Sequence, residues 1–300
     1  NSDDISTNKS FKPPIHKEQI ALNAHDLIKR VPGENPFEAP DFRAGLIMRM
    51  FRGMVKIERK IRRSMELQAS QVLQTGTITL TNDAGVALYT LDFKPKATHY
   101  PTVGTAWGTA GADPLGDISA LAEVIRNDGL EDPDELIMGV DAFNAFIADE
   151  AVQKAFDNRR METGRIVSME KRGNGGTFRG VVEVGNYSYD IWTYGGRYKD
   201  PQTGNKIQFV DPSKVIVRSS MARLEVSFGA IPNIGTLLGA QATNLLPELP
   251  SRLSNDAGGM DLFTNVWLSP NGEQIFGGVG ARPLMIPVAI DTYGCLETNA

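Results

Sequence analysis

A single long helix is the feature that most constrains this chain, and the sequence predicts it over residues 41–74. Apolar side chains recur at intervals of three and four residues, which places them on one face of a helix. Asp41 is a favourable N-cap for the segment, and Gly76 ends it. At about 1.5 Å per residue the helix would be roughly 50 Å long, more than one compact domain needs for its own core. The apolar residues are Ile47, Met50, Met54, Ile57 and Ile61.

The same segment is basic, although the whole protein has a formal net charge of -5. Between residues 43 and 63, eight lysines and arginines accompany one acid, Glu58. Since one face is apolar, the cations are expected on the opposite face. A solvated surface and a contact surface for polyanions or acidic neighbouring subunits both remain open at this point. The basic residues are Arg43, Arg49, Arg52, Lys56, Arg59, Lys60, Arg62 and Arg63.

The remaining composition argues against several classes of protein. Cys295 is the only cysteine, which excludes an intrachain disulfide or a multi-cysteine metal site and favours a reducing cytoplasm. The three histidines are scattered, and the glycines at 173–180 and 203–206 lack the spacing of nucleotide-binding loops. No apolar run approaches the roughly 20 residues that cross a bilayer. We expect a soluble protein that is not an enzyme and uses no cofactor or metal, with an unrecognised hydrolase as the weakest alternative.

The rest of the chain predicts an α+β layout with much irregular structure. Residues 11–31 contain few apolar side chains and two prolines, so we expect an extended arm or edge strand, ordered by contact with something such as a neighbouring molecule. Residues 160–180 should form a glycine-rich basic loop, and the acidic run 128–135 a solvated connection. Further predictions are hairpins at 77–93 and 181–194, a helix at 114–129, a strand at 135–140 before an aromatic helix, and strands at 215–217, 263–268 and 284–290.

Several short stretches occur in the order and spacing of one known family. RVPGENP (residues 30–36) precedes the basic helix, and GTAW (104–107) and DP (113–114) follow the first hairpin. YGGRY (194–198) and PLM (283–285) come later. Together, over roughly residues 11–290, they resemble the phage lambda major head protein family, the tailed-phage major capsid proteins with the Hong Kong 97 fold.

The resemblance implies an α+β, Hong Kong 97-like capsid fold. Residues 1–38 would form the return half of an extended loop, and 39–112 a peripheral domain that contains the spine helix, 41–76. Residues 113–255 would form an axial domain, and 256–300 would return to the peripheral domain. The outgoing half of the loop is not found, and Asn1 in place of Met indicates that earlier residues were removed or omitted.

The resemblance also implies a function. The chain would be a major capsid protein that self-assembles, as hexamers and pentamers, into the icosahedral head shell of a tailed double-stranded DNA phage. It would assemble in the host cytoplasm and enter the virion, with packaged DNA on the inner face, decoration and scaffold proteins as further partners, and no membrane. The alternative is a DNA-binding structural protein that uses the basic helix 43–63. The predicted intersubunit contacts are Lys12, Lys17, Lys29 and Arg30 in the extended loop and Arg52, Lys56, Arg59 and Arg63 in the spine helix.

Overall fold

Contacts within the chain divide it into two units, which are described separately. Unit 1 comprises Asn1–Met65 and Val226–Leu284, and unit 2 comprises Glu66–Glu225 and Met285–Ala300. The division at residues 38, 112 and 255 that the resemblance implies stays a prediction. The computed structural model describes residues 15–23, 42–82, 85–156, 164–172, 175–184, 186–200, 202–229, 231 and 261–299.

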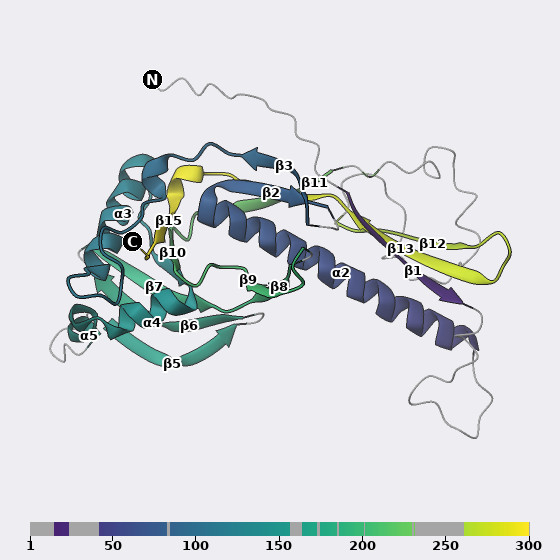
Figure 1. The fold of residues 1–300 in the computed structure, drawn as a ribbon, viewed down its shortest axis with the longest axis horizontal. Coiled ribbons are helices and arrows are strands. Elements are labelled where there is room, and N and C mark those ends of the chain that lie inside the picture. Colours follow the sequence, from purple (N-terminus) through teal and green to yellow (C-terminus); the bar gives the residue numbers. More distant parts are fainter. Residues whose placement is uncertain are drawn as a thin grey trace. The chain divides into compact units, whose positions relative to one another are not determined.

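The predicted long helix is confirmed as α2 (Phe42–Thr75; Figure 1). Gly76 ends it with φ 65°, and its N–H donates to the Val72 carbonyl at 2.8 Å. Glycine adopts this left-handed conformation at little cost. The expected N-cap, Asp41, lies outside the described residues. Neither α2 nor any other described helix combines the length and apolarity that crossing a membrane requires.

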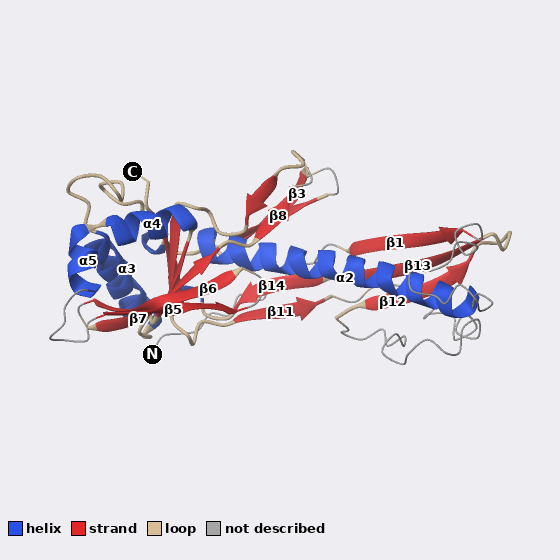
Figure 2. Cartoon of the chain, turned by 90° about the horizontal axis from the view of Figure 1, so that it is seen from below, coloured by secondary structure: helices blue, strands red, loops and turns tan. Residues whose placement is uncertain are grey.

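In unit 1 the apolar face of α2 covers a three-stranded antiparallel sheet of order β1-β13-β12, which both ribbon views show alongside the helix (Figures 1 and 2). The expected core position Ile47 is 40% exposed, because it lies one turn before Met50, the first buried residue of α2 in this cluster. The buried cluster contains Met50, Met54, Ile57 and Ile61 of α2 with Ile275, Val279 and Ala281. The strands are β1 (His16–Asn23), β12 (Phe263–Leu268) and β13 (Gln274–Ala281).

The central strand β13 was not predicted, because its glycines lower the strand propensity of the segment. Those glycines let the helix approach the sheet. A Cβ on Gly277 would lie 2.9 Å from Met54 Cε and closer still to Met50 Sδ. The missing side chain is therefore what admits the two methionines, as expected where two backbones come close.

The predicted edge strand in the arm is confirmed as β1. It pairs antiparallel with β13, from His16 opposite Ala281 to Asn23 opposite Gln274. Ile20 and Leu22 pack against the unit 1 core. The expected ordering contact, for which a neighbouring molecule was one example, is made by β13 of the same chain.

Unit 2 is built on a six-stranded sheet of order β15-β10-β4-β7-β6-β5, covered by three helices (Figure 1). Only β4 and β7 are parallel among the described pairs of this sheet. The strands are β4 (Glu135–Met138), β5 (Gly164–Arg172), β6 (Gly176–Val184), β7 (Tyr187–Tyr194), β10 (Lys214–Arg218) and β15 (Tyr293–Glu297), and the helices are α3 (Pro114–Gly129), α4 (Val140–Ala148) and α5 (Glu150–Phe156).

The expectation of a loop at 160–180 was wrong, since β5 and the start of β6 occupy this segment. The two strands pair antiparallel, from Gly164 opposite Val182 to Arg172 opposite Gly176, with an irregularity between Ile166 and Glu170. Glycine and charge lower the local strand propensity, but β6 supplies the backbone partner that sequence alone cannot reveal.

Helix α3 begins and ends where its sequence predicts. Asp113 caps its start by accepting a hydrogen bond from the Gly116 N–H at 3.0 Å, with Pro114 in the first position. After Gly129 the chain turns through Leu130, which has φ 54° and is 87% exposed. A large apolar residue in this conformation and in solvent marks the end of α3 as unusual.

Two short antiparallel hairpins complete unit 2, and β11–β14 forms a further two-stranded ribbon. The predicted hairpin at 77–93 is confirmed as β2–β3. Its turn lies close to that of β8–β9, since a Cβ on Gly85 would be 2.6 Å from Gln202 Cβ. The remaining elements are β2 (Thr77–Thr81), β3 (Ala87–Asp92), β8 (Arg197–Lys199), β9 (Lys206–Gln208), β11 (Leu224–Phe228) and β14 (Pro283–Pro287), with short 3₁₀ helices η1 (Ala97–His99) and η4 (Ile290–Thr292).

The single thiol gives a direct test of the unit 2 core. Cys295 packs with Val210 and Ile216, and burial raises the pKa of Cys295 to about 12. Because the thiolate is the reactive form, a water-soluble maleimide at pH 8 should label the folded chain at least about 100-fold more slowly than the urea-unfolded chain. Equal labelling rates would contradict this packing. The chain has one cysteine, so mass spectrometry reads the site without ambiguity.

Candidate assembly surfaces

Four predicted contact residues form one line along α2, here called the cationic stripe: Arg52, Lys56, Arg59 and Arg63. Their spacing of four, three and four residues places them within about 60° of one another around the helix. The buried residues Met54 and Ile61 lie on the opposite side. All four cations are exposed, and none has an ion pair with a described residue.

Other cations of α2 are already engaged within unit 1. Lys60 Nζ lies 2.6 Å from Glu18, and Arg62 Nη2 lies 2.7 Å from Asp261. The hydrogen bond to Asp261 raises the pKa of Arg62 further above its ordinary value. These exposed pairs contribute little stability, about 0–1 kcal/mol each. The ion pairs distinguish two groups of basic residues on α2. Lys60 and Arg62 bind acids of their own chain, whereas the charges of the cationic stripe are available to another molecule.

The predicted loop contacts are placed only in part. Lys17 is exposed on the edge strand β1, opposite Gly280 of β13. Lys12, Lys29 and Arg30 lie outside the described residues. Their role in contacts between copies stays a prediction.

A polar cluster around the buried His99 holds three elements of unit 2 together. His99 Nδ1 lies 2.9 Å from the Tyr293 carbonyl, and Nε2 lies 3.1 Å from Asp128. Lys96 Nζ lies 3.1 Å from Asp128 and 3.6 Å from Asp291. The cluster thus ties η1, the end of α3 and η4 together.

The cluster should make unit 2 sensitive to acid. Hydrogen bonds from Lys96 and then His99 hold the pKa of Asp128 below its ordinary value. A carboxyl group of this kind stabilises the fold above its unfolded pKa, about 3.9, and that stability is lost as pH falls through the lower folded value. Asp128→Asn should therefore be less stable than the unchanged chain at pH 7, with the difference shrinking below about pH 4. Urea midpoints at both pH values measure this, and a difference independent of pH would contradict it.

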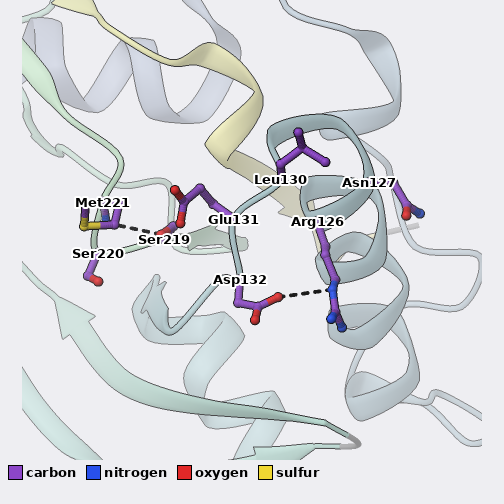
Figure 3. Close-up of a pocket in the computed structure, with 8 residues that line it drawn as sticks. All are labelled: Arg126, Asn127, Leu130, Glu131, Asp132, Ser219, Ser220 and Met221. Carbon is purple, nitrogen blue, oxygen red and sulfur yellow. Dashed lines mark hydrogen bonds and ion pairs between the residues drawn. The ribbon is translucent and has the colours of Figure 1, made fainter.

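A surface hollow of about 540 Å³ lies beside the end of α3 and is here called the α3 hollow (Figure 3). Arg126 Nε lies 3.3 Å from Asp132, and the Ser220 N–H donates to Asp134. Leu130 and Met221 are 87% and 58% exposed. The lining residues are Arg126, Asn127, Leu130, Glu131, Asp132, Ser219, Ser220 and Met221.

No sequence pattern predicted the α3 hollow. Its acidic side was expected to be a solvated connection, and its other side comes from residues 219–221, after β10. The pairing of β10 with β4, from Val215 opposite Met138 to Arg218 opposite Glu135, brings the two segments together. Among the described residues, no cluster of histidine, cysteine or acidic side chains could hold a metal ion.

Comparison with solved structures gives the fold. A prophage capsid protein of Escherichia coli CFT073 matches 95% of this chain and 77% of its own, with a TM-score of 0.70 and 17% identity. A phage-related protein of Bordetella bronchiseptica RB50 is more distant, with a TM-score of 0.47 and 12% identity over 95% of this chain and 75% of its own. An encapsulin of Synechococcus elongatus PCC 7942 has a TM-score of 0.44 and 12% identity over 98% of this chain and 77% of its own. No curated protein matches the chain.

The family follows from a match over nearly the whole sequence. The model for phage major capsid protein E matches residues 2–293. Together with the prophage capsid fold, this confirms the Hong Kong 97-like architecture and the capsid family expected from the sequence. The family is structural and not enzymatic, and it contributes to the virion. The chain therefore belongs to the phage major capsid protein E family, whose members form the protein shell of phage particles.

Proposed function

We propose that this chain assembles as hexamers and pentamers into the icosahedral head shell of a tailed phage that packages double-stranded DNA. The family match over residues 2–293 is the observation that supports this most strongly. Closed symmetry repeats each contact many times, so modest interfaces give a stable shell. Assembly would take place in the host cytoplasm, with decoration and scaffold proteins as partners.

The cationic stripe supports a specific role in this assembly. We assign Arg52, Lys56, Arg59 and Arg63 to contacts with acidic surfaces of neighbouring copies, with Lys12, Lys17, Lys29 and Arg30 as the loop contacts. Neighbours are favoured over DNA, because dense packaging is better served by weak phosphate contacts than by tight ones. In this proposal the segments at residues 1–38, 39–112, 113–255 and 256–300 keep the extended-loop, peripheral, axial and returning peripheral roles.

Electron microscopy of the purified full-length protein, with its scaffold where one exists, tests the proposal. Closed shells or rings of five and six copies are the expected result. A dispersed monomer that binds double-stranded DNA, with an affinity that falls steeply between about 50 and 200 mM salt, would instead favour the DNA-binding alternative.

A further inference from the structure

We propose that the β8–β9 hairpin of one copy docks in the α3 hollow of a neighbouring copy. The inference rests on the proposed function, because it names one contact through which copies would join. Both surfaces belong to unit 2.

The α3 hollow offers apolar surface and one uncommitted charge. Leu130 and Met221 expose most of their side chains there. Asp132 is paired with Arg126, whereas Glu131 is exposed and has no ion pair with a described residue. The hollow therefore fits a partner that brings an apolar side chain together with a cation.

The hairpin has the complementary character. Its exposed side chains include three cations, Arg197, Lys199 and Lys206, and Ile207, which is 42% exposed. None of the three cations has an ion pair with a described residue. The nearby acid, Asp200, accepts hydrogen bonds from the Thr203 hydroxyl at 2.6 Å and N–H at 3.1 Å, which hold it in its own turn. The hairpin thus presents a basic and partly apolar surface on a preorganised turn.

The hollow and the hairpin lie at opposite ends of the unit 2 sheet. Parallel β4 and β7 run side by side, with Glu135 opposite Asp190 and Met138 opposite Thr193. The hollow lies where β4 begins, and the hairpin starts just after Tyr194, where β7 ends. The length of β4 alone separates the two ends by roughly 13 Å, and both ribbon views place α3 and β8 at different ends of this unit (Figures 1 and 2).

This placement decides the symmetry of the contact. Because the two surfaces lie at opposite ends of one sheet, the hairpin of a copy does not fill the hollow of the same copy. The contact is then head-to-tail, with different patches meeting, and such contacts close into rings when the rotation fits. Opposite charges at its two sides would speed correct encounters and disfavour wrong ones.

Charge exchange between the two surfaces tests the proposal. The proposed docking pairs Lys206 of the hairpin with Glu131 of the hollow. Glu131→Lys and Lys206→Glu each place like charges in this pair at every junction, so each should lower the assembled fraction at least tenfold at about 0.1 M salt, by sedimentation and electron microscopy. The double variant restores opposite charges at every junction and should assemble within about twofold of the unchanged chain. At about 1 M salt, where the Debye length is near 3 Å, the differences should narrow.

Controls separate this contact from folding and from the proposed function. Glu225→Lys, at an exposed acid on β11, should assemble normally, and the melting temperatures of all unassembled variants should agree. Normal assembly by either single variant, or failure of the double variant, overturns the docking while leaving the capsid function intact. Failure of the unchanged chain to form rings or shells counts against the proposed function itself.

Discussion

Replacing Gly139 with alanine should cost unit 2 about 3 kcal/mol of its free energy of unfolding, a large effect for a single methyl group. A Cβ there would lie 2.6 Å from the Pro212 carbonyl carbon and closer still to the carbonyl oxygens of Asp211 and Pro212. The backbone at Gly139 has φ -63° and ψ 161°, which any residue can adopt. The expected cost therefore comes from lack of space alone.

The obstructing backbone cannot easily move away. The Pro212 carbonyl accepts the N–H groups of Asp141 and Ala142 at 3.1 and 2.8 Å, and the Gly139 N–H donates to Lys214 at 2.9 Å. Shifting Pro212 would break the bonds that satisfy the start of α4, and unpaired buried N–H groups are costly. The added methyl group therefore cannot be accommodated by a small movement of the loop at 211–212 without breaking these hydrogen bonds.

Urea unfolding of the unassembled protein, followed by labelling of Cys295, reads the stability of unit 2 specifically. Gly104→Ala is the matched control, because a Cβ at Gly104 meets no atom within 4 Å. The control should change stability by less than about 0.5 kcal/mol. Equal urea midpoints for the two variants would show that the loop 211–212 yields, and would contradict the prediction.

Reversing the charge of Arg59 should block assembly while leaving the isolated chain folded. Arg59 lies within the cationic stripe, between Lys56 and Arg63, and has no ion pair with a described residue, so its loss should not affect unit 1. If acidic surfaces of neighbouring copies face the stripe, Arg59→Glu places like charges at every repeated contact. We expect at least a tenfold fall in the assembled fraction at about 0.1 M salt.

The control for this variant is Lys154→Glu, which reverses an exposed lysine on α5 that pairs only with Glu150 one turn away, among described residues. That change removes a weak helix pair, worth about 0.3–0.5 kcal/mol, and should leave assembly unchanged. Normal shells from Arg59→Glu would refute the contact role of the stripe. Normal shells with a weakened affinity for DNA would assign the stripe to the genome.

The parts of the fold that could be predicted were those with local signals. The periodicity of α2 identified Met50, Met54, Ile57 and Ile61 as buried, and the same spacing placed the cationic stripe on the opposite face. It missed the buried residues of the last two turns, Gln68, Ser70 and Val72, and Ile47 is exposed. The strand at 263–268 was predicted with the bounds that β12 has. In these segments the pattern of side chains within the segment is enough to predict its secondary structure.

The parts that could not be predicted depend on distant partners. The glycines of β13 lower its strand propensity, so the sequence pattern does not indicate a strand. Their role becomes apparent only from the structure, where the methionines of α2 pack against them. β5 needs β6 as its partner, and the α3 hollow needs β10 to bring Ser219 to the end of α3. Sequence spacing contains no information on such approaches, so the acidic residue Glu131 gave no sign of a site.

The pairing of β1 with β13 also has a consequence for the order in which a newly made chain can fold. Synthesis completes α2 early, but the sheet that covers its apolar face needs residues 263–281, which emerge near the end. Until then, Met50, Met54, Ile57 and Ile61 lack their partners from β13, and contacts between such distant segments form slowly. A chain truncated before residues 263–281 cannot complete the fold of unit 1. Unit 1 can therefore fold only after nearly the whole chain has been synthesised, and only then can a copy join a shell.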